Sequence, residues 1–149
     1  MLSLGYDDLQ VGVKLSGSTT IRESHLVVSA GLFNDFNTMH MNEVVARRSP
    51  LGGRILHAPT TIGLMLGVIG NAVAETGIAD LETTFRFRSP VGIGDTISYE
   101  WEVIDREDKP KYLGGIVTTK GTCVNHEGTL VVEARNKPLI ASVRYGERA

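Results

Sequence analysis

One long apolar run in the middle of the chain limits the folds that are open to it. The segment "HAPTTIGLMLGVIGNAVAETG" has large apolar residues on nearly every face of a helix: Ile62, Leu64, Met65, Leu66, Val68, Ile69 and Val73. We therefore expect this helix to be surrounded by protein. Pro59 suits its first turn, and Gly77 suits the residue past its end. Gly63, Gly67 and Gly70 would let a sheet approach the helix backbone closely.

After Ile78 the hydrophobic period changes from helical to two. Four strands are predicted in "LETTFRFRS", "TISYEWEVI", "YLGGIVTTKGTCV" and "TLVVEARNKPLIA", and the second has Ile97, Tyr99, Trp101 and Val103 on one face. "PVGIGD" and "NHEG" supply turns, the latter with Gly128 available for a positive φ. Two short helices are predicted earlier, over residues 23–33 and in "NEVVARR" with Asn42 as its N-cap. The order predicts an α+β fold in which an antiparallel sheet wraps one long helix.

Length and charge exclude several classes of protein. A chain of 149 residues fits one domain, 1–149, and a net charge of −2 argues against a general nucleic-acid binder. The single cysteine, Cys123, excludes an intrachain disulfide framework, suits a reducing compartment and makes a zinc site unexpected. The amino terminus has no signal-peptide pattern, and the longest apolar stretch, of about 13 residues, is short of the ~20 that cross a bilayer. We expect a cytoplasmic protein without nucleic-acid or membrane partners.

A polar loop, "NDFNTMH", directly follows the first predicted helix. Asp35 and His40 lie five residues apart across a segment that favours a turn, so a carboxylate and an imidazole could face one water molecule and activate it. Asn37 is expected to brace the loop backbone. A turn of this composition is more often a structural cap than a catalytic pair, and at this point both interpretations stay open.

The start of the long helix is the second element of the candidate site. If Ala58 and Pro59 open the helix, the backbone NH of Ala58 is free, and the positive end of the helix dipole points toward the same region. Such a donor stabilises a developing oxyanion, for example the enolate formed when water adds to a double bond conjugated to a thioester. His57 is expected to be a hydrogen-bonded residue that orients the helix start.

These segments resemble a known family. "DFNTMH", followed by "RILHAPTTIGLM", is similar to the hydratase signature of MaoC-like hot-dog proteins, D-x-N-P-x-H and then I-A-H-G-M, and "FRFRSPVGIGDTISYEWEV" resembles their later segment. The resemblance implies a hot-dog fold and reversible hydration of an enoyl thioester of coenzyme A or acyl carrier protein, and the (R)-specific enoyl-CoA hydratases are the nearest group. It also implies a homodimer, or a higher oligomer, with its active site at the subunit interface.

By position in these motifs, Asp35 and His40 match the pair that holds and activates water, Asn37 matches the motif Asn, and Ala58 takes the place whose NH polarises the thioester carbonyl. His57 is a supporting residue, and no cofactor is expected beyond the coenzyme A thioester as substrate. The chain departs from the motifs at four positions, where Asn34, Thr38, Asn42 and Ala58 replace Gly, Pro, Asp and Gly. We expect these four departures to change which acyl group is bound more than they change the reaction.

Two other functions stay open at this stage. A hot-dog thioesterase would use a carboxylate on the central helix, where the sequence offers only Glu75 near the far end. A non-catalytic module would bind acyl groups without reaction. Arginines are expected near the phosphates of coenzyme A, and the candidates are Arg47, Arg48, Arg54, Arg86 and Arg88. The sequence does not identify the acyl chain, the direction, the carrier, or which of Asp35 and His40 moves which proton.

Overall fold

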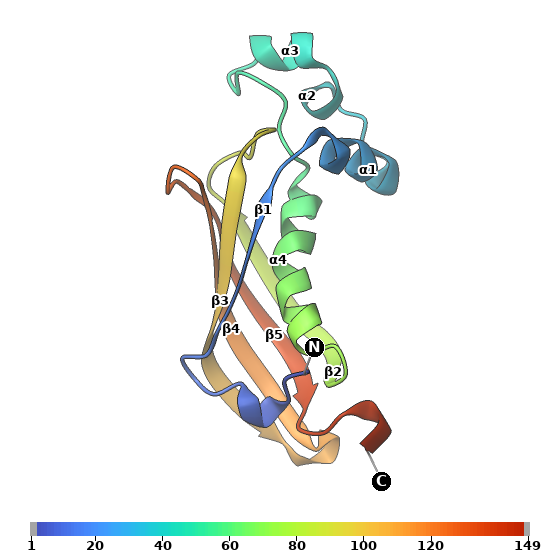
Figure 1. Ribbon diagram of the computed structural model, residues 1–149, viewed down its shortest axis with the longest axis vertical. Helices are drawn as coiled ribbons and strands as arrows, with labels where there is room; N and C mark the ends of the chain where they lie inside the picture. The colour runs from blue at the N-terminus through green and yellow to red at the C-terminus, as the bar shows by residue number, and fades with distance from the viewer. Residues whose placement is uncertain (1–2, 148–149) are drawn as a thin grey trace.

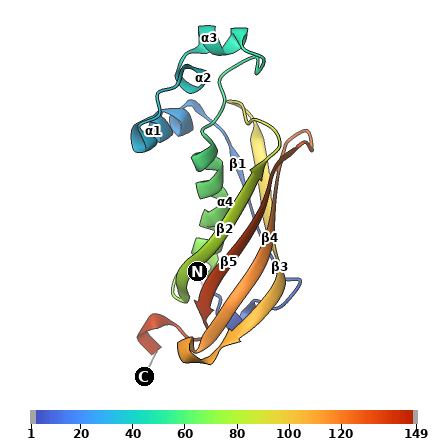
Figure 2. The same cartoon turned by 180° about the vertical axis from the view of Figure 1, so that it is seen from behind.

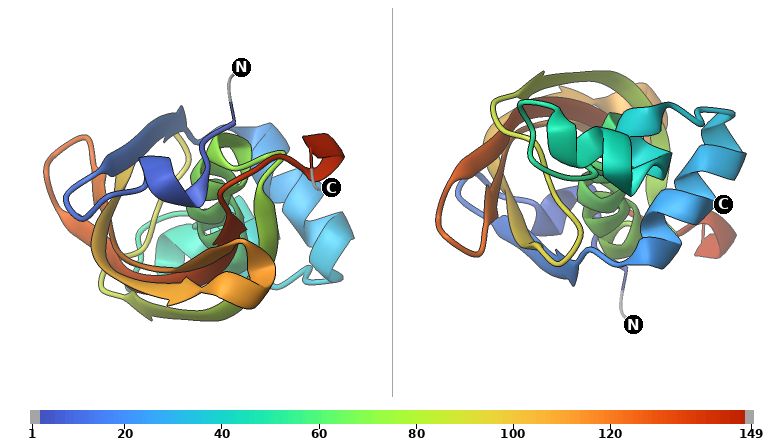
Figure 3. Two further views of the ribbon diagram at one scale, coloured as in Figure 1. Left: turned by 90° about the horizontal axis from the view of Figure 1, so that it is seen from below. Right: turned by 90° about the horizontal axis from the view of Figure 1, so that it is seen from above.

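Five antiparallel strands curl around one long helix in the computed structural model, which describes residues 3–147 (Figure 1). The strands are β1 (Lys14–Thr20), β2 (Gly77–Phe87), β3 (Thr96–Lys109), β4 (Gly114–Asn125) and β5 (Leu130–Ala141), and the sheet order is β1-β3-β4-β5-β2. The long helix is α4 (Ala58–Ala72), and three shorter helices precede it: α1 (Glu23–Phe33), α2 (Thr38–Met41) and α3 (Glu43–Arg48). The end-on views show the sheet curving around α4 (Figure 3). This is the predicted hot-dog arrangement.

Trp101 joins the sheet to the helix. The predicted inner face of β3 is confirmed, because Ile97, Tyr99, Trp101 and Val103 are all buried. The Trp101 indole donates from Nε1 to the backbone carbonyl of Met65, in the middle of α4, at 2.8 Å. Gly121 on β4 makes room for the indole, since a Cβ there would lie 2.6 Å from the ring. Position 121 therefore has to be glycine for the helix to be held at this height.

The long helix begins where the sequence predicted and ends earlier. Pro59 lies in its first turn, as expected. The prediction that Gly77 follows its end is wrong, because α4 stops at Ala72 and Gly77 is the first residue of β2. The Gly77 NH donates to the carbonyl of Val73 at 2.8 Å, and a Cβ on Gly77 would lie 2.9 Å from the Val73 side chain. Glycine is needed at position 77 because the start of β2 packs closely against Val73.

One face of α4 is uncovered in the single chain. Thr61, Met65 and Ile69 are buried against the sheet. Gly63, Gly67 and Gly70 are exposed, and a Cβ on any of these three glycines would meet nothing within 4 Å. The expectation that a sheet approaches these glycines is therefore wrong within this chain, as is the expectation that protein surrounds the helix on all sides. Both followed from apolar residues on several helix faces, a pattern that does not say which chain covers them.

The other predicted elements are largely confirmed, and one strand was missed. Helices α1 and α3 lie where they were expected, and Asn42 caps α3 by accepting the Val45 NH at 3.0 Å. Gly128 has the positive φ that its turn requires. Strand β1 was not predicted, because "KLSGSTT" is polar and its pattern resembles a loop. Among the described residues, 3–147, it pairs only with β3, at the edge of the sheet, so an apolar outer face is not required.

Cys123 and the apolar helices bear on two further points. Cys123 is buried on β4, and its burial raises the pKa of the thiol to about 11, so the thiol is unreactive. Within residues 3–147, none of the helices combines the length and apolar character needed to span a bilayer.

The contact between Trp101 and Met65 predicts a measurable loss of stability. Trp101→Phe removes the Nε1 donor and part of a fully buried ring, so we expect the free energy of unfolding to fall by about 2–3 kcal/mol. Urea unfolding followed by circular dichroism measures this change. Tyr112→Phe, at an exposed aromatic residue, is the control and should change it by less than about 0.5 kcal/mol. A Trp101→Phe effect as small as the control would show that the indole does not hold α4.

Candidate active site

The polar loop starts where α1 ends. Asn34 is the C-cap of α1 and has a left-handed backbone, φ 53°, which asparagine tolerates better than most residues and which explains why glycine is common there in the resembling motif. The NH of Asp35 then donates to the Ala30 carbonyl at 3.1 Å. The chain thereby turns sharply off the helix, so that the Asp35 carboxylate projects from the turn.

Asn37 braces this loop in the way the sequence predicted. Its NH donates to Asp35 Oδ1 at 3.2 Å, and its own Oδ1 accepts the Met39 NH at 3.0 Å, which caps the single turn of α2. Because α2 carries His40, Asn37 links the carboxylate and the imidazole through one short segment. Thr38, which replaces the motif proline, begins this turn.

Asp35 and His40 face each other. His40 Nε2 lies 3.6 Å from Asp35 Oδ2, and the side chains are 13% and 47% exposed respectively. His40 Nδ1 lies 2.7 Å from the Ile55 carbonyl, which can only accept, so Nδ1 carries a hydrogen. In the neutral ring Nε2 is then an acceptor. An acceptor nitrogen and a carboxylate oxygen that face each other are suited to share the protons of a water molecule.

His57 is the buried partner of this pair, 1% exposed. Its Nε2 donates to the backbone carbonyl of Asp35 at 2.9 Å, and its ring stacks on His40 with centroids 3.8 Å apart and planes 24° apart. The two histidines make crossed bonds, from His40 in the loop to Ile55 before α4, and from His57 at the start of α4 back to Asp35 in the loop. Nothing in the sequence indicated this stacking.

The same three side chains could be mistaken for a metal site. One ligand atom from each of Asp35, His40 and His57 lies within 4.8 Å of the others. Imidazole lone pairs lie in the ring plane, however, and the two stacked rings have nearly parallel planes. Each ring also has one nitrogen bonded to a backbone carbonyl. This geometry suits proton transfer better than convergence of three ligands on one ion.

Ala58 places a free NH beside the pair. It is the first residue of α4, so its NH has no intrahelical acceptor, and it directly follows His57, which contacts both Asp35 and His40. A hollow of about 300 Å³ opens here, and its lining includes Ala58, Thr61, Phe87 and Val131. The helix start is tied to α1 by a 2.5 Å hydrogen bond between the hydroxyls of Ser29 and Thr60.

Arg54, a candidate for phosphate binding, is already engaged. It is 16% exposed and pairs with Glu23 of α1 at 2.6 Å and with Glu43 of α3 at 2.9 Å. Hydrogen bonds from Arg54 lower the pKa of Glu23, and those from Arg47 and Arg54 lower the pKa of Glu43. These lowered values stabilise the fold above the ordinary carboxyl range, and the contribution is lost as the pH falls through them. Arg54 therefore braces the helices on either side of the polar loop.

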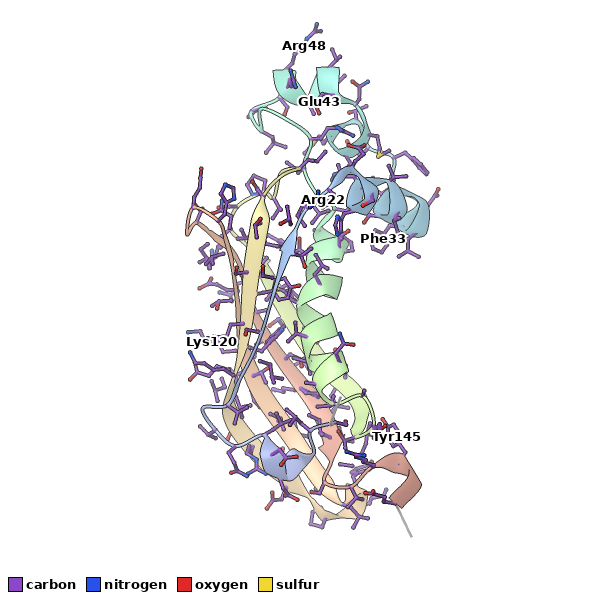
Figure 4. All side chains as sticks on the ribbon, in the orientation of Figure 1. Arg22, Phe33, Glu43, Arg48, Lys120 and Tyr145 are labelled. Carbon is purple, nitrogen blue, oxygen red and sulfur yellow. The ribbon has the colours of Figure 1, made fainter. Side chains whose placement is uncertain are left out.

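The other arginine candidates divide into two groups. Arg47 pairs with Glu43, and Arg88 pairs with Glu133. Arg48 and Arg86 are exposed, and within residues 3–147 neither has a carboxylate within 4.0 Å. Figure 4 shows Arg48 at the tip of α3, far from the body of the sheet. Of the five candidates, these two are still available to a phosphate.

Comparison with known proteins assigns the family. The MaoC like domain family matches residues 8–125, which is most of the chain. The chain belongs to the MaoC-like family. Among curated MaoC-like relatives, an (R)-specific enoyl-CoA hydratase of Rhodospirillum rubrum is 30% identical over 137 residues, covering 87% of this chain and 92% of that protein. A 3-hydroxybutyryl-CoA dehydratase of Methylorubrum extorquens is 35% identical over 102 residues, covering 68% of this chain and 65% of that protein.

Solved structures of MaoC-like proteins have the same fold. The R-hydratase PhaJ1 from Pseudomonas aeruginosa superposes with a TM-score of 0.85 at 25% identity, over 95% of this chain and 88% of that one. The (R)-hydratase from A. caviae involved in PHA biosynthesis gives a TM-score of 0.78 at 28% identity, over 87% of this chain and 96% of that one. The resemblance expected from the short motifs therefore extends over the whole fold.

Proposed function

We propose that Asp35 and His40 activate water for the reversible hydration of an enoyl thioester. The chain is a hydro-lyase of the MaoC-like family, and its relatives are named for hydration or dehydration of CoA thioesters. The observation that supports the catalytic assignment is the 3.6 Å approach of His40 Nε2 to Asp35 Oδ2, with His40 Nδ1 already bonded to a carbonyl. Asp35 Oδ2 and His40 Nε2 can therefore both accept hydrogen bonds from the same water molecule.

In the hydration direction, a water held between these two acceptors gives up one proton to the pair as its oxygen forms a bond to C3 of the enoyl group. The electrons of the C2–C3 double bond move toward the thioester carbonyl, whose oxygen becomes an enolate. The pair then returns a proton to C2, which completes the addition of one water molecule. Dehydration is the same sequence in reverse, and we expect it to need no further cofactor.

Ala58 is assigned to the enolate. Its free NH, at the positive end of α4, stabilises negative charge on the thioester oxygen, an effect for which one donor is worth roughly 3 kcal/mol in the transition state. We assign His57 and Asn37 to supporting roles, because both hold the Asp35 loop through backbone hydrogen bonds. The substrate is a thioester of coenzyme A or of acyl carrier protein, and cytoplasmic location stays a prediction from the sequence.

A thioesterase role finds little support in the geometry. Glu75 lies in the turn after α4, at the opposite end from Ala58, and its carboxylate pairs with Arg144 at 3.2 Å. A carboxylate engaged there does not face the free helix NH. The non-catalytic alternative is separated from the hydratase by activity measurements.

The catalytic assignment predicts a large and selective loss of activity. Asp35→Asn and His40→Ala should each lower the kcat for hydration of crotonyl-CoA by about 10²–10⁴-fold, because each removes one of the two groups that exchange protons with water. Loss of absorbance of the conjugated thioester measures the rate. A panel of branched enoyl-CoA substrates, assayed in parallel, tests whether the acyl group is unusual.

His126→Ala is the matched control, since His126 lies on an exposed turn outside the site and the variant should keep full activity. Absence of wild-type turnover on every enoyl thioester would exclude the hydratase. Release of free coenzyme A by the wild type would instead support a thioesterase. Full activity in Asp35→Asn would overturn the assignment of the pair.

We also propose that the active protein is a homodimer. Within residues 3–147, strand β2 is an edge of the sheet and pairs only with β5, and it runs alongside α4 (Figure 2). The uncovered face of α4 carries exposed glycines. Leu81 on β2 is 52% exposed. An unpaired edge next to an uncovered helix face suits pairing with a second copy, which would place the uncovered face of α4 at the interface.

This proposal predicts an effect of charge at the β2 edge. Leu81→Lys should raise the dimer dissociation constant by at least tenfold, because the interface would have to desolvate an unpaired ammonium group. Sedimentation velocity over a range of concentrations measures the constant. Val11→Lys, at another exposed aliphatic residue, is the control and should leave it unchanged. A wild type that sediments as a monomer at all concentrations would refute the dimer.

A further inference from the structure

A second hollow lies beside the other end of α4. It has a volume of about 290 Å³, and it opens between the carboxyl-terminal half of α4 and strands β2 and β5, where Figure 2 shows β2 running alongside the helix. The helix side is apolar and the strand side is partly polar, with a lining that includes Leu66, Ile69, Gly70, Asp80, Asn136 and Pro138. Thus a polar wall faces an apolar one at the end away from Ala58.

Asn136 is the buried member of the polar wall, 1% exposed. Its Nδ2 donates to Asp80 Oδ1 at 2.6 Å and to Thr83 Oγ1 at 2.7 Å, and Thr83 Oγ1 donates in turn to the Asp80 carboxylate at 2.9 Å. The Asn136 Oδ1 atom is buried without a hydrogen-bond partner. A buried acceptor left unpaired is costly, so this atom calls for an explanation.

Asp80 is exposed, and its carboxylate accepts hydrogen bonds from Asn136 and Thr83 but has no cationic partner in the described part of the chain. Within residues 3–147, no lysine, arginine or histidine nitrogen lies within 4.0 Å of its carboxylate. Lys137, which follows Asn136 on β5, pairs with Glu82 at 3.0 Å instead. We call Asp80, Thr83 and Asn136 the distal acceptor cluster, because the atoms in it that can still form hydrogen bonds are acceptors. What the cluster lacks is a hydrogen-bond donor.

A purely structural role explains part of this arrangement. The register between β2 and β5 shifts between Asp80 and Glu82, and the two bonds from Asn136 Nδ2 hold the strand at that irregularity. The same role leaves the buried Asn136 Oδ1 atom without a function. An apolar residue with the shape of asparagine would avoid the cost of that unpaired acceptor.

The cluster lies within reach of an acyl chain bound at the active site. Leu66 is eight residues beyond Ala58, roughly 12 Å along the helix at ~1.5 Å per residue. Three consecutive bonds of an extended chain span ~3.3–3.6 Å, so roughly ten bonds cover that distance. Leu66 lines the second hollow, and Leu66, Phe85 and Ala134 are partly buried apolar side chains packed against the core. To meet the cluster, an acyl chain has to follow α4 past such apolar side chains.

We propose that the distal acceptor cluster recognises a hydroxyl or amino group at the far end of a medium-length acyl chain. The proposal rests on the hydratase function proposed above. A terminal donor would bond to the Asp80 carboxylate and to Asn136 Oδ1, whereas a terminal methyl group would displace water from the exposed carboxylate and leave Asn136 Oδ1 unpaired. Sites built to bond a hydroxyl reject analogues that lack it, so the cluster selects by the cost of desolvation.

The test is a paired substrate series. The wild type is assayed with 2-enoyl-CoA substrates of about eight, ten and twelve carbons that end in a hydroxyl, and with alkyl analogues of equal heavy-atom number. We expect kcat/KM to favour the hydroxyl member by roughly tenfold to a hundredfold at the length that reaches the cluster. Asp80→Ala should bring that ratio close to one. Asn136→Leu should also reduce the ratio. If Asn136→Leu does not fold, Thr83→Val, at a less buried position, takes its place and should reduce the ratio too.

Asp105→Ala removes an exposed carboxylate elsewhere, on β3, and should leave the ratio at its wild-type value. A ratio near one in the wild type at every length, with crotonyl-CoA still hydrated, would overturn this proposal alone. Failure to hydrate crotonyl-CoA and every member of the series would overturn the proposed function instead. A wild-type preference that persists in Asp80→Ala and Thr83→Val would show that the selection lies outside the cluster.

Discussion

Two crossed hydrogen bonds from imidazole to backbone carbonyl hold the candidate site together. His40 Nδ1 donates to Ile55 and His57 Nε2 donates to Asp35, so the polar loop and the start of α4 each supply one ring and one carbonyl. The rings then stack at 3.8 Å. Because each ring has one nitrogen committed to a carbonyl, its hydrogen is assigned by geometry, and His40 is left with an acceptor that faces the Asp35 carboxylate. The proposed chemistry depends on that acceptor.

The rest of the fold holds the polar loop and the start of α4 in place. Trp101 fixes the height of α4 against the sheet through the Met65 carbonyl, which sets the position of Ala58 and His57 at the helix start. Arg54 ties α1 to α3 through Glu23 and Glu43, which encloses the loop between two braced helices. Arg54, which the sequence offered as a phosphate-binding candidate, is thereby used to hold the helices beside the loop that carries Asp35 and His40. Helix α4 lines both the hollow beside Ala58 and the hollow that holds the distal acceptor cluster, so the proposed chemistry and the proposed selection depend on the same helix.

Much of this arrangement could be predicted from residue patterns. The alternation around Trp101 predicted the buried face of β3, and the change of period after Ile78 predicted the strands that follow. Asp35 and His40 were placed together because a turn of that composition keeps its ends close. Stacking of His40 on His57 could not be predicted, because it depends on where α4 starts relative to the loop. Strand β1 was missed because an edge strand needs no apolar outer face. The covering of Gly63, Gly67 and Gly70 was misjudged because a sequence does not distinguish contacts within a chain from contacts between chains.

The most direct test of the central claim is the tautomeric state of the two histidines, read from the nitrogen-15 shifts and couplings of the imidazole rings in the uniformly labelled protein. At a pH where both rings are neutral, the crossed bonds require His40 to carry its hydrogen on Nδ1 and His57 to carry its hydrogen on Nε2. Observation of that pair of opposite tautomers would support the assignment of His40 Nε2 as the acceptor that faces Asp35. A His40 ring protonated on Nε2, with Nδ1 free, would mean that the bond to Ile55 does not form, and the proposed activation of water by this pair would fail.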